Sequence, residues 1–410
     1  MDRVFDVCHG CRLCWNLCPS FSDLFGAIDN QHDGAVKELT DHEHEQVVEG
    51  CFQCKLCYLK CPYTPPHEWN LDFPRLMLRA SAARWRRQGG SLVDQVLART
   101  DLLGALNSAM APLVNAITGT PGTVIRVLME KTIGIAAKRV LPRYAAQRFS
   151  AWAKRRSSPG GSTGNGTVAL FQTCLVEYQN TALGKDTVRV FEHNKIGCSV
   201  PEGTVCCGMP WLDVGNLDAF TEQARKNVAA LAPEVRAGRD VVVLQPTCGY
   251  VLKNEYPSYL GTEDAKLVGQ HSYDASEYLM KVHREAGKGL DTNFPGPKPQ
   301  TITWQVPCHL RAQNIGFKSR DLMALTGATV IVVDRCAGID GSWGLRAKNY
   351  EAAVKVALPM VNAVKQAGSE VVAGDCNLAN GVITEETGRA PMHPIQVLAR
   401  AYGFPEEPSE

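Results

Sequence analysis

The sequence predicts an α/β protein that has an α-helical domain at its N-terminus and two repeated domains built on parallel sheets. Three observations predict this fold: two cysteine runs of equal spacing, a cysteine-free segment of helical pattern after them, and two C-terminal stretches in which apolar strands alternate with helices. Such alternation is typical of parallel sheets covered by helices. With 410 residues, the chain is long enough for several domains with cores of their own.

Composition narrows the class of protein. The chain is 45% hydrophobic and 21% charged, with a formal net charge of +1, which excludes a mostly disordered protein and gives no reason to expect nucleic acid as a partner. Its 16 cysteines are spread over the whole length, unlike those of a small disulfide-bonded scaffold. The first cysteine is residue 8, which leaves no room for a secretory signal before it. We therefore expect a cytoplasmic protein whose cysteines bind metal or carry redox chemistry.

The N-terminal domain, expected over residues 1–90, carries two runs with the spacing C-x2-C-x2-C-x3-C-P. The runs are Cys8, Cys11, Cys14, Cys18 and Cys51, Cys54, Cys57, Cys61. In two-cluster ferredoxins the fourth cysteine of such a run binds the other cluster. We therefore expect two [4Fe–4S] clusters, one on Cys8, Cys11, Cys14 and Cys61, the other on Cys51, Cys54, Cys57 and Cys18. Zinc binding or free thiols are the alternatives, but zinc sites of this kind use two pairs of ligands rather than a run of four.

Residues 91–160 are expected to form a basic helical connector. The stretch 102–125 is uncharged but too polar and too interrupted by proline to span a membrane. After it, basic side chains alternate with apolar ones at helical spacing: Arg126, Lys131, Lys138, Arg139, Arg143, Arg148, Lys154, Arg155 and Arg156. A basic amphipathic helix of this kind favours binding to a membrane surface. The alternative is a helix that packs on the cluster domain. Residues 157–166, rich in Gly and Ser, are expected to be a flexible linker.

The remaining chain divides into two stretches of the same plan, expected over 161–298 and 299–410. Each opens with an apolar strand that leads to a cysteine, Cys174 or Cys308, and a Gln-Asn pair follows soon after. A second landmark comes next, Cys206-Cys207-Gly208 in one stretch and Cys336-Ala337-Gly338 in the other. A helical pattern and another strand then lead to Cys248 or Cys376. This agreement of order and spacing indicates an internal repeat.

In parallel sheets the carboxyl ends of the strands meet at one edge, so the cysteines of each repeat should converge there. The first repeat offers Cys174, Cys206, Cys207 and Cys248, enough thiolates for an additional iron–sulfur centre. The second offers only Cys308, Cys336 and Cys376, because Ala337 stands where the first repeat has Cys207. Cys198 lacks a counterpart in the second repeat and is interpreted as a core thiol. His309 is a substitute ligand, a proton donor near a quinone, or a histidine hydrogen-bonded at a strand end.

Together the paired cluster motifs and the two cysteine-rich repeats resemble the CCG-domain (cysteine-rich domain) iron–sulfur oxidoreductases, a family that includes a component of heterodisulfide reductase. The resemblance implies that a full repeat, C…CC…C-x2-C, holds a non-cubane cluster on five cysteines. Here Val251 and Ala379 stand in place of the last cysteine, so the first repeat keeps four ligands and the second three.

These features favour an iron–sulfur electron-transfer subunit. It would pass electrons between a flavoprotein or other redox partner and an acceptor such as quinone. A second hypothesis is a heterodisulfide-reductase-like enzyme that reduces a disulfide or small substrate at a repeat-bound cluster, and a third is a structural scaffold with vestigial repeats. The reduced ligand count favours transfer over cleavage. The sequence carries neither a P-loop nor a G-x-G-x-x-G motif, so no nucleotide of its own is expected. The location expected is cytoplasmic, or peripheral on the inner face of the cell membrane.

Overall fold

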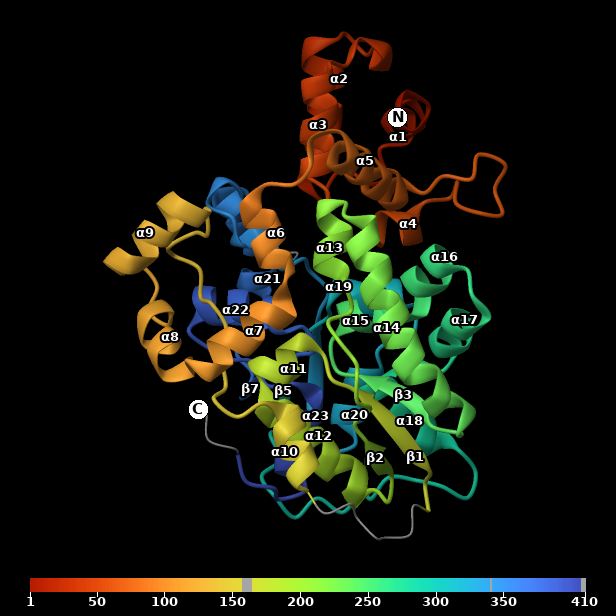
Figure 1. Cartoon of the computed structure of the whole chain (residues 1–410), viewed down its shortest axis with the longest axis vertical. Coiled ribbons are helices and arrows are strands. Elements are labelled where there is room, and N and C mark those ends of the chain that lie inside the picture. Colours follow the sequence, from red (N-terminus) through yellow and green to blue (C-terminus); the bar gives the residue numbers. More distant parts are fainter. Residues whose placement is uncertain (157–163, 340, 407–410) are drawn as a thin grey trace.

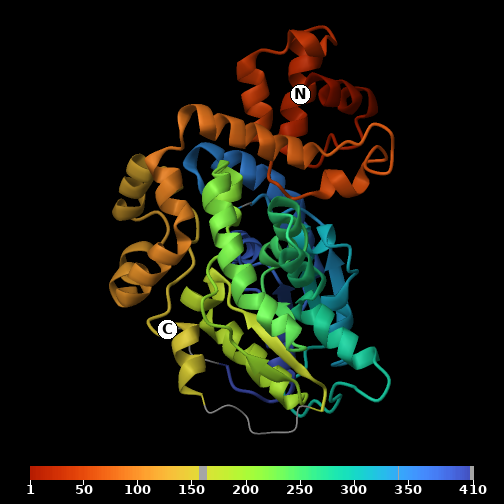
Figure 2. The ribbon, with the colours of Figure 1, turned by 45° about the vertical axis from the view of Figure 1, so that its right-hand side comes forward.

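The computed structural model describes residues 1–156, 164–339 and 341–406. The helices of residues 2–88 lie at one end of the molecule, the two sheets lie toward the other, and the connector helices run along one side (Figures 1 and 2). Of the linker expected over 157–166, residues 157–163 lie outside the described residues.

The N-terminal region is helical, as predicted. Its helices are α1 (Asp2–Cys11), α2 (Pro19–Gln31), the 3-10 helix η1 (Val36–Glu38), α3 (Asp41–Glu49), α4 (Leu56–Lys60) and α5 (Phe73–Gln88). They enclose an aromatic core in which the rings of Phe21 and Phe73 stack with centroids 4.5 Å apart. Helix α3 begins with a capping box formed by Thr40 and Glu43, which satisfies backbone amides at its first turn. This small core holds the two cysteine runs against each other.

The connector is a series of short helices. They are α6 (Leu92–Ala98), α7 (Thr100–Ala109), α8 (Ala111–Thr118), α9 (Val124–Ile133) and α10 (Phe149–Arg155). The expected basic amphipathic helix is therefore wrong as a continuous element, because residues 134–148 between α9 and α10 are not helical. Helix α7 packs closely on the first repeat: a Cβ atom at Gly104 would lie 2.3 Å from the ring of Tyr178, so only glycine fits there.

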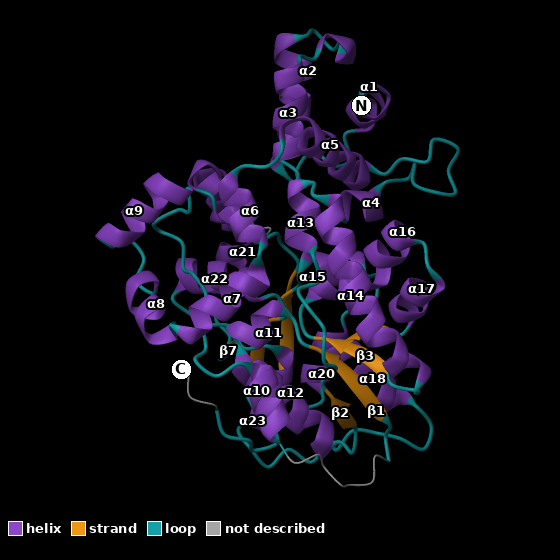
Figure 3. Cartoon of the chain, in the orientation of Figure 1, coloured by secondary structure: helices purple, strands orange, loops and turns teal. Residues whose placement is uncertain are grey.

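The first repeat is built on a four-stranded parallel sheet with strand order β2-β1-β3-β4 (Figure 3). The strands are β1 (Thr167–Phe171), β2 (Gly197–Ser199), β3 (Asp240–Val243) and β4 (Ser272–Asp274), and Val168 pairs with both Cys198 and Asp240. The helices are α11 (Cys174–Tyr178), α12 (Thr181–His193), α13 (Met209–Val214), α14 (Leu217–Arg236), α15 (Pro246–Tyr250), the π-helix η2 (Val251–Glu255), α16 (Tyr256–Leu260), α17 (Glu263–Gln270) and α18 (Ala275–Arg284).

Both faces of this sheet are buried, which explains why its strands are apolar at every position rather than alternately. Val168 and Leu170 face one core with α12 and α18, whereas Phe171 and Val243 face a second core with α14. Successive side chains on a strand point to opposite faces, and here each face has its own layer of helices.

The second repeat has a three-stranded parallel sheet with strand order β6-β5-β7. Its strands are β5 (Thr301–Gln305), β6 (Thr329–Val333) and β7 (Val371–Gly374), with Trp304 opposite Val332 and Ala373. Its helices are α19 (Cys308–Ala312), α20 (Lys318–Ala324), the 3-10 helices η3 (Trp343–Leu345) and η4 (Ala347–Asn349), α21 (Tyr350–Ala367), α22 (Asn377–Thr387) and α23 (Pro394–Ala401). The two-repeat α/β fold predicted from the sequence is thus confirmed.

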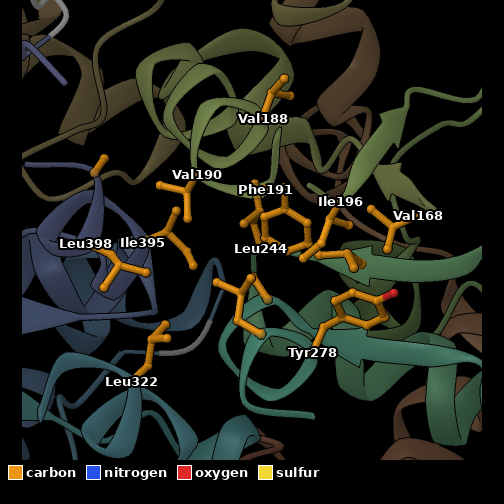
Figure 4. Packing of buried hydrophobic residues seen from close by; sticks show 14 of the residues in the cluster. Val168, Val188, Val190, Phe191, Ile196, Leu244, Tyr278, Leu322, Ile395 and Leu398 are labelled. Carbon is orange, nitrogen blue, oxygen red and sulfur yellow. The ribbon is translucent and has the colours of Figure 1, made fainter. Parts of the chain in front are cut away.

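A single hydrophobic core joins the two repeats. Figure 4 shows Phe191 and Leu244 of the first repeat packed with Leu322, Ile395 and Leu398 of the second. These three second-repeat residues come from α20 and α23 and are fully buried. The repeats therefore form one packed unit, which fixes their cysteine-bearing edges relative to each other.

Candidate iron–sulfur centres

Three non-glycine residues with positive φ turn the chain within the two N-terminal cysteine runs. Arg12 (φ 54°) and Lys55 (φ 62°) both follow the second cysteine of their run, and Gln53 (φ 54°) precedes Cys54. Left-handed backbone is uncommon outside glycine and redirects the chain sharply. Because the turn recurs at the same position in both runs, the first three cysteines of each run curl around one volume.

The first thiol group contains Cys8, Cys11, Cys14 and Cys61. Burial raises the pKa of Cys8 to about 12, and the neighbouring thiols of Cys14, Cys61 and Cys11 contribute to the rise. Burial likewise raises the pKa of Cys14 to about 11, again with Cys61 and Cys11 as neighbours. The structure thus brings the last cysteine of the second run next to three cysteines of the first.

The second thiol group contains Cys51, Cys54, Cys57 and Cys18. Burial, then Cys51 and Cys54, raise the pKa of Cys18, while hydrogen bonds from the amides of Phe21 and Ser20 at the start of α2 lower it. Burial, then Cys54, Cys51 and Cys18, raise the pKa of Cys57. The exchange of fourth cysteines between the runs is the arrangement that the ferredoxin spacing predicts.

In the first repeat, the cysteines that follow three strands come together. Cys174 begins α11, Cys206 and Cys207 precede α13, and Cys248 lies in α15. The Cys206 thiol is hydrogen-bonded to Cys174 and Cys207, and Cys207 is also hydrogen-bonded to Cys248. Burial contributes to raising the pKa values of Cys174 and Cys207. Gly208 then turns the chain with φ +87°, as Gly338 does with φ +62° in the second repeat.

The residues that surround this group were not predicted from the sequence. Asp101, from connector helix α7, accepts a 2.9 Å hydrogen bond from the Cys206 amide through Oδ2, and burial raises its pKa to about 6. The Tyr256 hydroxyl donates to the Cys207 carbonyl (2.9 Å), and Asn227 Nδ2 donates to the Cys206 carbonyl (3.2 Å). Only Asp101 carried a signal, as the acid immediately before a long uncharged stretch.

In the second repeat, Cys308 begins α19, Cys336 follows β6 and Cys376 is the N-cap of α22. They follow three adjacent parallel strands, which places them at one sheet edge. The Cys376 thiol accepts a 3.3 Å hydrogen bond from Gln245 Nε2 of the first repeat, and the Cys336 thiol accepts one from the Gly338 amide (3.3 Å). Ala337 and Ala379 are both buried.

His309, which follows Cys308, connects the second repeat to the second cysteine run. Its Nε2 donates to the carbonyl oxygen of Gln53 (2.9 Å), and its Nδ1 lies 2.9 Å from the Thr247 hydroxyl. Burial and the charge of Lys55 lower the pKa of His309 to about 4. The neutral ring therefore donates at Nε2 and accepts at Nδ1. Among the three interpretations of His309, the structure shows the hydrogen-bonded histidine.

A buried ion pair reinforces this contact. Lys55 Nζ lies 3.2 Å from Glu255 Oε1, and both side chains are buried. Arg75 of α5 contacts the other oxygen of Glu255 at 3.1 Å. On the other side of the motif, the rings of Phe52 and Trp343 meet edge to face with centroids 4.4 Å apart. The loop that carries Cys51 and Cys54 is thus held by both repeats.

The donor set at these positions fits iron–sulfur clusters. Thiolate is their usual ligand, and a bound positive centre keeps deprotonated a thiol whose pKa burial has raised. Among the described residues, no three His, Cys, Asp or Glu side chains converge on the position of a single metal ion. Cys198 lies apart from the groups above, packed against the core of the first repeat, and burial raises its pKa.

Two of the basic connector residues expected at a membrane surface are buried instead. Arg126 donates to the carbonyl oxygens of Thr118 (2.8 Å) and Ala136 (3.0 Å). Arg139 donates to the Gly344 carbonyl (2.8 Å) and pairs with Glu385 (2.9 Å). Both therefore hold the connector in place and tie it to the second repeat. Among the described residues, none of the helices has the length and apolar character needed to cross a bilayer.

Comparison with known proteins agrees with this architecture. Residues 1–62 match the model of the 4Fe-4S dicluster domain, and residues 168–253 and 302–380 both match that of the cysteine-rich domain, CCG. The chain belongs to the CCG-domain iron–sulfur proteins. Each CCG match covers the strands and cysteines of one repeat.

Several relatives of this CCG-domain protein are parts of larger enzymes. The chain is 28% identical to the C subunit of anaerobic glycerol-3-phosphate dehydrogenase from Escherichia coli K12 over 405 residues, which are 98% of this chain and 99% of that one. It is 25% identical over 244 residues to the B subunit of fumarate reductase (CoM/CoB) from Methanothermobacter marburgensis, covering 58% of this chain and 46% of the relative. It is also 25% identical over 252 residues to lactate utilization protein A of Bacillus subtilis, covering 56% and 98% respectively.

Proposed function

We propose that this chain is the iron–sulfur electron-transfer subunit of a multi-subunit oxidoreductase. Its N-terminal cysteines would hold two [4Fe–4S] clusters in the two groups described above, and Cys174, Cys206, Cys207 and Cys248 would hold a further centre. Such clusters, when bound, accept and release single electrons. The donor would be a flavoprotein or other redox partner, and the acceptor a quinone at a membrane surface.

The observation that carries this proposal is the contact between the second cysteine run and both repeats. Gln53 lies between Cys51 and Cys54, and its carbonyl accepts from His309, which in turn contacts Thr247 one residue before Cys248. One short series of buried hydrogen bonds therefore runs from the N-terminal thiols to those of both repeats. This packing excludes water between the groups and holds them in fixed positions, as electron transfer requires.

The ligand count supports transfer over substrate reduction. The first repeat retains four thiols in mutual contact, whereas Ala337 and Ala379 leave the second with three. The relatives named as subunits of an anaerobic dehydrogenase and of a fumarate reductase support a partner protein for this chain.

Exposed apolar side chains on the connector support a membrane surface as the place of action. More than half of the exposed large apolar residues found in the described part of the chain lie on α6 to α9. They are Leu92, Val96, Leu102, Leu106, Met110, Leu113, Val124, Ile125, Val127 and Leu128. Helices α8 and α9 stand on the outer side of the molecule in Figure 1. An apolar surface of this kind on a water-soluble face is a mark of membrane or partner binding.

Charge favours anionic lipid as the occupant. Exposed Lys131, Lys138 and Arg143 follow the apolar helices in sequence. Glu130 is the only acid between residues 102 and 150, and its carboxylate accepts from the Ala137 amide at 2.6 Å. Basic residues beside an apolar face attract the negative surface of a bilayer.

The test uses the chain purified anaerobically with its clusters. The clusters are reduced with photoreduced flavin and mixed with anionic vesicles that contain a long-chain quinone, and visible absorbance follows the redox state. The proposal predicts reduction by flavin and reoxidation only with the quinone-loaded vesicles. Clusters that flavin does not reduce, or that quinone vesicles reoxidise no faster than empty ones, would overturn it.

A further inference from the structure

A cavity of about 350 Å³ adjoins the second cysteine run, and its walls come from four parts of the chain. Cys51 and Gln53 line it together with Trp85 and Arg84 of α5, Asp213 of α13 and the segment that contains Trp343 and Arg346. Its volume falls in the range of roughly 300–1,000 Å³ typical of small-molecule sites. A ligand here would lie beside a thiol of the second group.

The cavity walls favour a flat, uncharged ligand. Two tryptophans line it, and large aromatic rings offer extended faces for stacking. Its cations are already paired: Arg84 lies 3.3 Å and Lys348 2.9 Å from Glu49, and Arg346 pairs with Asp94. Because these charges are balanced, the cavity lacks the excess positive charge that an anionic ligand would require.

One polar group in the cavity wall is left over. Among the described residues, Asp213 Oδ1 is a buried oxygen without a hydrogen-bond partner. Burial raises the pKa of Asp213 to about 7, with Glu255 raising it and Lys55 lowering it. A carboxyl group that can carry a proton donates a hydrogen bond to a ligand carbonyl, whereas an unpartnered buried oxygen costs stability.

The rim of the cavity leads to the exposed apolar surface of the connector. Gly90 and Ser91 line the cavity, and the next residue, Leu92, is 80% exposed at the start of α6. Val96, one turn later, is 47% exposed. A ligand with an apolar tail could thus leave its head group in the cavity and place the tail along α6.

We propose that this cavity binds the head group of a quinone, with the ring between the walls that carry Trp85 and Trp343 and one ring carbonyl at Asp213. This inference rests on the proposed function, since it places the acceptor of that function beside Cys51. It assigns the acceptor to the second thiol group rather than to the cysteine-rich repeats.

Titration calorimetry of the anaerobic, cluster-loaded chain with ubiquinone-1 tests the site. The fully substituted ring of this short-tailed quinone does not alkylate thiols. We compare Trp85→Leu and Asp213→Asn with Trp69→Leu, since Trp69 is a partly exposed tryptophan that does not line the cavity. Iron content and the spectra of the clusters confirm that each variant is folded and loaded.

The proposal predicts saturable binding to the unaltered chain. It also predicts an affinity lower by about tenfold in Trp85→Leu and by several-fold in Asp213→Asn, and no change in Trp69→Leu. Absence of binding, or equal affinity in all three variants, would overturn the quinone site. Failure of the proposed function would be seen separately, as clusters that flavin does not reduce.

Discussion

His309 and Gln53 are 256 positions apart in the sequence, yet His309 Nε2 lies 2.9 Å from the Gln53 carbonyl oxygen. The contact joins the residue after Cys308 to the loop between Cys51 and Cys54. Through it, the N-terminal domain and the second repeat share a buried hydrogen bond next to thiols of both.

Replacing His309 should disturb the cluster expected on Cys51, Cys54, Cys57 and Cys18. In His309→Ala the Gln53 carbonyl loses its donor, and we expect a shift of that cluster's midpoint potential and a loss of about 1 kcal/mol of unfolding free energy. His309→Gln, whose amide N–H can reach the same carbonyl, should restore most of both. A potential that is equal in all three proteins, measured by EPR-monitored redox titration, would contradict a role for this contact.

Cys18→Ala tests the exchange of ligands between the cysteine runs. The variant should lose the EPR signal that Cys54→Ala also loses, and keep the signal that Cys11→Ala loses, because Cys18 lies with Cys51 and Cys54. Cys198→Ala serves as the control, since that thiol packs in the core of the first repeat. If Cys18→Ala instead matched Cys11→Ala, each run would hold its own cluster.

Membrane binding should depend on exposed connector residues and not on buried ones. Flotation with anionic vesicles should weaken when Leu106, Leu113 and Leu128 become Gln, and when Lys131, Lys138 and Arg143 become Gln. At ~1 kcal/mol per basic residue near the surface, the triple charge variant should bind about a hundredfold more weakly. Ile331→Gln and Leu358→Gln, on exposed apolar residues of the second repeat, are the controls. Equal flotation of all variants would leave the connector surface to a protein partner.

Asp274 should make stability fall as pH rises. Burial, then Asp375 and Glu277, raise its pKa from 3.8 to about 8, while Lys253 and the Ser276 amide oppose the rise. Between these two values the native state holds the proton more tightly than the unfolded chain, so unfolding free energy decreases with pH. Asp274→Asn keeps a side-chain acceptor for the Ser276 amide but cannot ionise.

The stability advantage of Asp274→Asn should therefore be larger at pH 8 than at pH 6, as measured by urea unfolding at both values. Asp264→Asn, at an exposed position, controls for general charge effects. An advantage that is constant with pH would show that Asp274 does not titrate in this window.

Local patterns were sufficient to predict most of the architecture. The spacing of Cys8 to Cys18 and its repetition at Cys51 to Cys61 indicate a ferredoxin-type domain because cluster geometry dictates ligand spacing. The matching order of Cys174 and Cys308, each after an apolar strand, indicates two parallel α/β repeats. Both features depend on neighbours in the sequence, and the fold confirms both.

Long-range packing was not predictable in the same way. Arg126 and Arg139 were expected on a lipid-facing helix, but carbonyl oxygens of Thr118, Ala136 and Gly344 bind them in the interior. Helical spacing and charge do not reveal which carbonyls will lie within reach. For the same reason, the contact of Asp101 with Cys206 appears only once α7 is placed against the first repeat.

The most direct test of the account is an iron count with EPR on the anaerobically purified chain and on Cys207→Ala. The account predicts about eight irons in two cubanes, further iron in the first repeat, and loss of that third centre alone in Cys207→Ala. Cys336→Ala, in the second repeat, should lose less iron than Cys207→Ala. An iron content near four or below with all motif cysteines intact would contradict it, as would a Cys207→Ala protein with unchanged iron and spectrum.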